Sequence, residues 1–89
     1  MSYWKDTIFE IFDCIDRELE DVDSAMLKID DIQILFKNIR IALQDRAEYK
    51  EALDLIDKNL AYMREKSLNI DGFKEDFRTV KEIVKREIQ

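Results

Sequence analysis

The sequence predicts an all-α fold: an up-down-up-down bundle of four helices in a single domain that spans residues 1–89. The chain contains no proline and one glycine, so it can build few tight turns and is poorly suited to an all-β fold. Apolar residues recur at steps of three and four in four consecutive segments, which is typical of amphipathic helices. Hydrophobic residues make up 46% of the chain and charged residues 40%, so the segments can supply both a core and solvated faces.

The first helix is expected at about residues 3–22. Residues 1–23 contain eight acidic and two basic residues, whereas the rest of the chain contains 13 of each sign. The whole net charge of −6 therefore lies on this segment. We expect Trp4 to close one end of the bundle. The apolar stripe of this helix consists of Trp4, Ile8, Ile11, Ile15, Leu19 and Val22.

The second helix is expected at about residues 24–44, with Ser24 as its N-cap. One alternative for residues 32–43 is a β-hairpin with its turn at Lys37 and Asn38, but that turn lacks the glycine that a two-residue hairpin favours. Another alternative follows from the short connection between the first two helices, which could fuse into one rod that a second chain must cover. The main apolar stripe of the second helix consists of Met26, Ile29, Ile32, Phe36, Ile39 and Leu43.

The third and fourth helices are expected at about residues 46–66 and 72–88. The stretch "DRAE" at residues 45–48 predicts a capping box, with its aspartate as the N-cap of the third helix. Gly72 is expected to form a hinge with positive φ, and Asp71 to cap the last helix. The apolar stripes consist of Tyr49, Ala52, Leu53, Ile56, Leu60 and Met63 in the third helix, and of Phe73, Phe77, Val80, Val84 and Ile88 in the fourth.

The stretch "NIDGFKEDF" at residues 69–77 resembles part of a calcium-binding loop. If Gly72 takes loop position 6, Asn69 and Asp71 take positions 3 and 5, where oxygen ligands are expected. Arg78 then takes position 12, where the loop needs a bidentate carboxylate. A guanidinium has no acceptor to offer a cation, so we expect a helix connection and no calcium site.

Several residue types that catalysis commonly uses are missing. The chain has no histidine, so it lacks the usual general acid–base and the usual transition-metal ligand. Its one glycine leaves no glycine-rich phosphate loop, and its single cysteine, Cys14, has no histidine to activate it. The carboxylates of Asp13, Asp16 and Glu20 could share a helix face and hold a cation, but a solvated face is the simpler interpretation. We therefore predict no enzyme activity, no cofactor, no metal and no small-molecule substrate.

Charge and hydropathy also restrict the partners. The acidic balance argues against direct binding to a nucleic-acid backbone. No run of residues approaches the roughly 20 apolar residues of a membrane span, and the first 20 residues do not resemble a signal peptide. We expect a cytoplasmic protein that binds neither membranes nor nucleic acid directly.

A second apolar row suggests a binding surface. Leu27, Ile34 and Ile41 are seven residues apart, on the side of their helix opposite its main stripe. Either a neighbouring helix or a partner must cover such a row, and we favour a partner. Phe9 lies among acidic residues, as an aromatic hot spot at an interface would.

The predicted function is that of a small, non-catalytic protein–protein interaction module, an adaptor or regulator that binds another protein or a second copy of itself. The acidic first helix is expected to give charge selectivity and to steer association. One alternative is an acidic inhibitor that imitates nucleic acid; another is a homo-oligomeric structural subunit. The predicted partner-binding residues are Leu27, Ile34, Ile41, Phe9, Asp6, Glu10, Asp13, Asp16 and Glu20.

Overall fold

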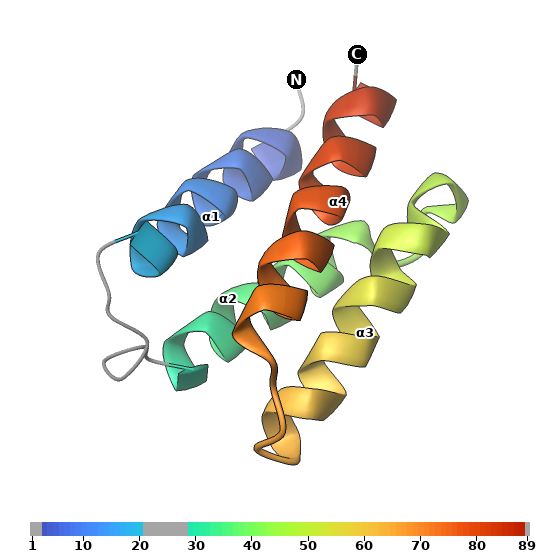
Figure 1. The fold of residues 1–89 in the computed structure, drawn as a ribbon. Coiled ribbons are helices and arrows are strands. Elements are labelled where there is room, and N and C mark those ends of the chain that lie inside the picture. The colour runs from blue at the N-terminus through green and yellow to red at the C-terminus, as the bar shows by residue number, and fades with distance from the viewer. Residues whose placement is uncertain (1–2, 21–28, 89) are drawn as a thin grey trace.

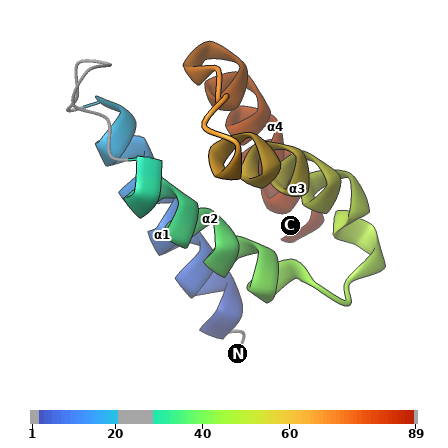
Figure 2. The same cartoon turned by 90° about the horizontal axis from the view of Figure 1, so that it is seen from below.

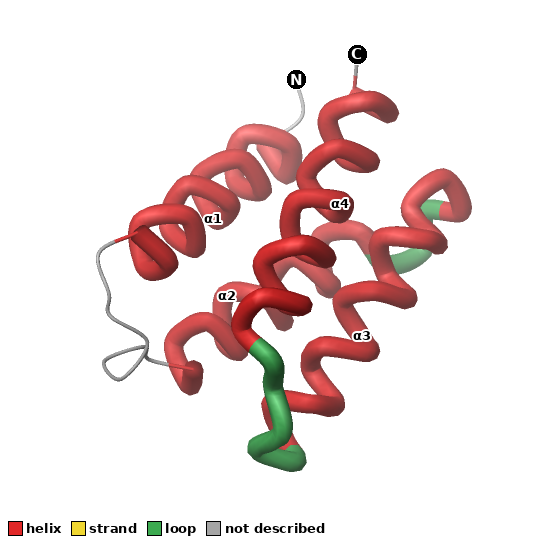
Figure 3. The backbone as a smooth tube through the Cα atoms, in the orientation of Figure 1, coloured by secondary structure: helices red, strands yellow, loops and turns green. Residues whose placement is uncertain are grey.

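The computed structural model describes residues 3–20 and 29–88. They form four α-helices, with one short 3-10 helix before the third and no strand in these two ranges (Figures 1 and 3). The predicted all-α four-helix bundle is therefore confirmed, and the hairpin alternative for residues 32–43 is wrong. The helices are α1 (Tyr3–Glu20), α2 (Ile29–Leu43), η2 (Ala47–Tyr49), α3 (Lys50–Arg64) and α4 (Ile70–Ile88).

The helices pack in sequence order. The closest backbone approaches join α1 with α2, α2 with α3, and α3 with α4, whereas α1 and α4 meet mainly through side chains. Because α1 and α2 lie side by side (Figures 1 and 2), the alternative in which they fuse into one rod is wrong. The start of α1 and the end of α4 lie at the same end of the bundle (Figure 1), as four alternating helices require.

Aromatic rings join three of the helices at the centre of the core. Phe73 and Phe77 of α4 contact Phe36 of α2, with ring centres 5.2 and 6.2 Å apart, and Phe77 also meets Phe12 of α1 at 5.8 Å. All of these pairs are edge-to-face, a geometry that stabilises aromatic contacts beyond the burial of their area. The predicted stripes thus face one core. Its buried apolar residues are Ile8, Phe12, Ile15, Ile32, Phe36, Ile39, Leu43, Tyr49, Ala52, Ile56, Leu60, Met63, Phe73, Phe77, Val80, Ile83 and Val84.

Trp4 closes one end of the bundle, as expected. Its half-buried indole meets the buried Tyr49 edge-on, with ring centres 6.1 Å apart. The Arg46 guanidinium lies 3.9 Å from the centre of the Trp4 ring, within the range of a cation–π contact. Burial raises the pKa of the Tyr49 phenol, and the carboxylates of Glu48 and Glu87 raise it further.

The predicted capping box at residues 45–48 is wrong. Asp45 has φ 69°, so it belongs to the left-handed turn that ends α2 and does not begin the next helix. The amide of Arg46 bonds back to the carbonyl oxygen of Leu43 at 3.3 Å. The chain then makes the turn of η2, and α3 begins at Lys50 with no side-chain cap at either η2 or α3.

The expected hinge at Gly72 is also wrong. Gly72 lies inside the first turn of α4 and does not have positive φ. The cap of this helix is Asn69 rather than Asp71: the amide of Gly72 donates to Asn69 Oδ1 at 2.9 Å, and the amide of Phe73 donates to the Asn69 carbonyl oxygen at 2.9 Å. This is the pattern of an N-cap side chain bonded to the third helical residue.

The chain reverses instead at Lys66, which has φ 57°. The amide of Ser67 bonds to the Tyr62 carbonyl oxygen at 2.9 Å, and the amide of Lys66 bonds to the Met63 carbonyl oxygen at 3.2 Å. This pair of bonds is a Schellman motif, which normally has glycine at the left-handed position. The turn that the sequence assigned to Gly72 therefore lies at the end of α3.

Candidate functional site

Ile34 and Ile41 are exposed on α2. Their exposed fractions are 59% and 60%, although Ile32, Phe36 and Ile39 of the same helix are fully buried. No described helix covers the two exposed isoleucines, so the alternative of a neighbouring helix that covers them is wrong for this part of the chain. Leu27, the third member of the predicted row, is outside the described residues. The exposed side of α2, called the outer face below, consists of Asp30, Asp31, Ile34, Lys37, Asn38 and Ile41.

The charges on the outer face are unevenly spaced. Asp30 and Asp31 lie at the N-terminal end of α2, and Lys37 lies near its middle. Arg40, at the side of the helix, is bonded through Nε to Asp57 of α3. Lys37 is therefore the base that the outer face offers to a partner.

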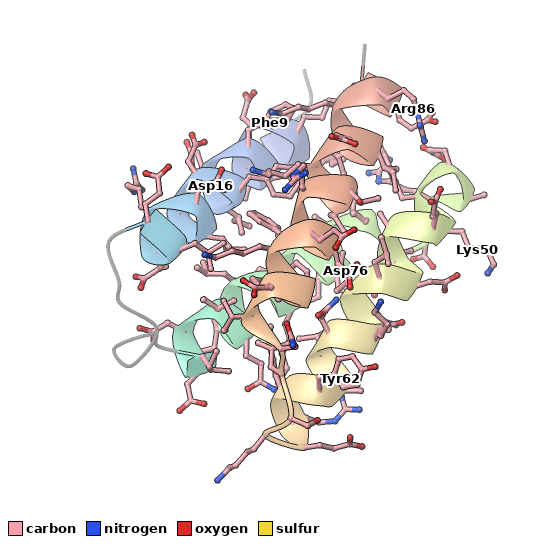
Figure 4. The ribbon with its side chains drawn as sticks, in the orientation of Figure 1. Phe9, Asp16, Lys50, Tyr62, Asp76 and Arg86 are labelled. Carbon is pink, nitrogen blue, oxygen red and sulfur yellow. The ribbon has the colours of Figure 1, made fainter. Side chains whose placement is uncertain are left out.

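The predicted acidic residues of α1 divide into two groups. Asp6, Glu10, Asp13 and Glu20 are exposed to solvent. Asp16 is half-buried, and its carboxylate accepts two hydrogen bonds from Lys81 Nζ, at 2.9 and 3.1 Å (Figure 4). Asp16 is thus already paired within the chain.

Phe9 is less exposed than its acidic neighbours suggested. Its side chain is half-buried and packs against the core. The ring meets Phe12 edge-on, with ring centres 6.1 Å apart. Phe9 lies beside the apolar stripe of α1 and widens the side of the helix that faces the bundle.

A cleft of about 270 Å³ lies between the C-terminal part of α1 and α4. Acidic side chains line it on the α1 side, and basic side chains line it on the α4 side. Opposite charges across a cleft attract and reduce the field that α1 projects into solvent. The lining residues are Asp16, Leu19, Glu20, Lys74, Phe77, Arg78 and Lys81.

A second cleft, of about 320 Å³, lies between α3 and α4. Asn59 is buried beside it, and its Nδ2 donates to the Leu55 carbonyl oxygen and to Asp76 Oδ2, each at 2.9 Å. Lys58 Nζ lies 2.9 Å from the same Asp76 oxygen. Burial raises the pKa of the Asp76 carboxyl, but the hydrogen bonds from Asn59 and Lys58 and the charge of Lys58 together lower it below its ordinary value.

The residues Asn59, Asp76 and Lys58 form a network that the sequence interpretation missed. One signal was present: Asn59 stands three residues after Ile56 and next to Leu60, in the apolar stripe of α3. A polar side chain at such a position needs a partner when it is buried. Its partner on α4, 17 residues away, could not be read from a local pattern.

The described residues offer little for metal or nucleophilic chemistry. No group of three or more His, Cys, Asp or Glu side chains in residues 3–20 and 29–88 is placed to hold a metal ion. Cys14 is half-buried, and its Sγ accepts a hydrogen bond from Arg17 Nη2 at 3.4 Å.

In the parts of the chain that the structure describes, no helix has the length and apolar character to cross a membrane. The chain matches no known protein family, no curated protein and no solved structure.

Proposed function

We propose that this protein is a small, non-catalytic protein-binding module whose binding surface is the outer face of α2. The observation that carries the proposal is the exposure of Ile34 and Ile41, at 59% and 60%. Single exposed apolar residues are common on protein surfaces. These two, however, share one face of one helix about 10 Å apart, and so form a row that a partner helix or groove can cover.

The expected binding energy from this row is modest. Fully burying an isoleucine side chain contributes about 1.5–3 kcal/mol, and each of these side chains still has somewhat more than half of its surface to bury. The rest of the affinity must come from the polar residues around the row. A partner should therefore complement the two aspartates and the lysine of the outer face as well as its isoleucines.

The acidic helix has an accessory role in this proposal. Asp6, Glu10 and Asp13 are exposed on α1, which lies beside α2. They would raise the association rate of a basic partner and leave its dissociation rate largely unchanged. Asp16 contributes less because Lys81 already pairs with it.

An inhibitor that imitates nucleic acid is the second candidate. The exposed carboxylates of Asp6, Glu10, Asp13 and Glu20 on one helix favour it. Binding through these carboxylates would weaken steeply as salt rises, whereas binding through Ile34 and Ile41 would not.

Site-specific cross-linking tests the proposal. A photo-reactive residue at Asn38 lies on the outer face, and the same residue at Lys50, on α3, is a control at another exposed position. In an extract of the native cells, Asn38 should yield one cross-linked protein, which excess unlabelled protein competes away and which Ile34→Glu abolishes. Purified samples of that protein and of this one should then bind each other.

The Ile34→Glu variant must keep its helical circular dichroism for the test to count. Equal labelling from both positions, or none from Asn38, would contradict the proposal. Loss of the cross-link in high salt with no effect of Ile34→Glu would favour the nucleic-acid imitation instead.

A further inference from the structure

We infer that the outer face of α2 binds a second copy of this chain, in an antiparallel pair of α2 helices that cross at Ile34. The inference rests on the proposed function, since it uses the same surface, and it names the partner. The inference is based on the order of charges along α2. Asp30 and Asp31 are acidic, Lys37 is basic, and all three side chains are exposed.

A two-fold axis through Ile34 fixes which residues meet. In an antiparallel helix pair with this axis, the residue n positions after Ile34 lies level with the residue n positions before it in the partner, and the two-fold rotation keeps each residue on its own flank of the contact. Lys37, three positions after Ile34, is turned about 60° away from the contact direction, and the partner's Asp30, four positions before Ile34, is turned about 40° to the same side. Lys37 and the partner's Asp30 therefore lie on one flank, offset along the helix by about one residue.

The neighbouring positions agree with this register. Asn38, four positions after Ile34, lies on the other flank beside the partner's Asp31, and an amide can donate to a carboxylate. Because the arrangement is symmetric, each of these two contacts occurs twice. The two Ile34 side chains meet on the axis.

Other registers of the same face are less favourable. An axis midway between Ile34 and Ile41 would place Lys37 beside the partner's Lys37 on the same flank, and so bring two ammonium groups together. A parallel pair would put Asp30 and Asp31 of both copies at the same end. Like charges directly opposite each other destabilise a helix pair, and Arg40 is already bonded to Asp57 within its own chain.

The pair should be weak and reversible. The outer face belongs to a helix of 15 residues, about 22 Å long, and so offers less than the roughly 800 Å² per partner of a standard interface. Both copies also carry a net charge of −6. At 0.15 M salt this long-range repulsion is screened beyond about 8 Å, while contacts across the interface are screened much less.

Charge exchange in the purified full chain tests both the partner and the register. Sedimentation velocity at physiological salt should show a monomer–dimer equilibrium at micromolar protein concentrations. Lys37→Glu alone and Asp30→Lys alone should each weaken self-association about tenfold, because each replaces two attractive contacts by two repulsive ones. An equimolar mixture of these two variants should associate more tightly than either alone, and the double variant should recover the wild-type equilibrium.

Two further variants complete the design. Ile34→Glu should abolish the dimer, and its circular dichroism must show an intact fold. Lys85→Glu, a matched charge reversal at an exposed position of α4, should leave the equilibrium unchanged.

A monomer at all concentrations would overturn the inference, and the proposed function would stand if cross-linking from Asn38 captured a different protein. A dimer that survives Ile34→Glu, or that the exchanged charges do not restore, would overturn the inference as well, because it would place the contact on another surface or in another register.

Discussion

Lys81 of α4 donates hydrogen bonds to both carboxylate oxygens of Asp16 of α1, at 2.9 and 3.1 Å. Its ammonium group also lies 4.8 Å from the centre of the Phe77 ring. The two residues are 65 positions apart in the sequence, and they connect α1 with α4, whose backbones do not approach closely. The pair therefore fixes the acidic first helix against the basic edge of the last.

We predict that this pair contributes more to stability than an exposed pair of the same charges. In a double-mutant cycle of Asp16→Asn and Lys81→Met, the coupling energy should be about 1 kcal/mol, at the upper end for surface pairs, because the side chains are only 38% and 21% exposed. Urea unfolding followed by Trp4 fluorescence measures it. The control cycle is Lys50 with Asp54, whose side chains are 80% and 68% exposed, and a coupling energy there as large as that of Asp16 and Lys81 would contradict the prediction.

The Asp76 carboxyl should make the free energy of unfolding depend on pH. Because its folded-state pKa is lowered, the unfolded chain takes up a proton first as the pH falls below about 4. The contribution of Asp76 is therefore fully present above that pH, and it is lost as the pH falls through the folded-state pKa.

The Asp76→Asn variant should accordingly lose stability at pH 7 and should show a flatter dependence of the free energy of unfolding between about pH 4 and pH 2. Urea unfolding at a series of pH values checks this. Asp54→Asn, which removes a carboxylate that is 68% exposed, is the control. If both variants reduce the pH dependence of the free energy of unfolding equally, the hydrogen bonds from Asn59 and Lys58 are not its cause.

The fold was largely predictable from the sequence because its signal repeats. The step of three and four residues recurs in every helix, and the buried apolar side chains of α2 and α3 belong to the predicted stripes. The exposure of Ile34 and Ile41 was predictable in the same way, since the side of a helix follows from spacing alone. The contacts of Asp16 with Lys81 and of Asn59 were not, because each depends on how two helices are aligned.

Helix ends were predicted less well because one residue type serves several local structures. An aspartate such as Asp45 can cap the next helix or adopt the left-handed turn that ends the previous one. Glycine is favoured in left-handed turns, but Gly72 lies within a helix, and Lys66 takes the turn instead. In both places the local preference of the residue type does not by itself give the position of the turn.

A substitution at Gly72 distinguishes a helical conformation at this residue from the hinge with positive φ that the sequence suggested. A methyl group at Gly72 would have ordinary van der Waals contact with Asn69, at 3.6 Å or more, and φ is not positive. Gly72→Ala should therefore stabilise the protein by about 0.5–1 kcal/mol through helix propensity. Thermal unfolding measures the change. A hinge with positive φ would make the same substitution destabilising.

Asn69 caps this helix, so Asn69→Ala should destabilise the protein by about 1 kcal/mol. Asp71→Ala, which removes the cap that the sequence suggested, should cost no more than a few tenths through the helix dipole. Urea unfolding of the two variants compares them directly. A larger loss of stability for Asp71→Ala than for Asn69→Ala would show that Asp71 is the N-cap, as the sequence predicted.

Lys66 should be the complementary case. It holds φ 57°, which costs an L-residue with a side chain about 1–2 kcal/mol, and its amide donates one of the two Schellman bonds. Lys66→Gly should therefore stabilise the protein by about 1 kcal/mol, although it adds freedom to the unfolded chain. Lys66→Ala should give no such gain, because alanine keeps the Cβ that opposes the left-handed turn.

Glu51→Gly, at an exposed position inside α3, should instead destabilise the protein by about 1 kcal/mol. Opposite signs for these two glycine substitutions, measured by urea unfolding, would locate the turn at Lys66, and a loss of stability in both would refute it.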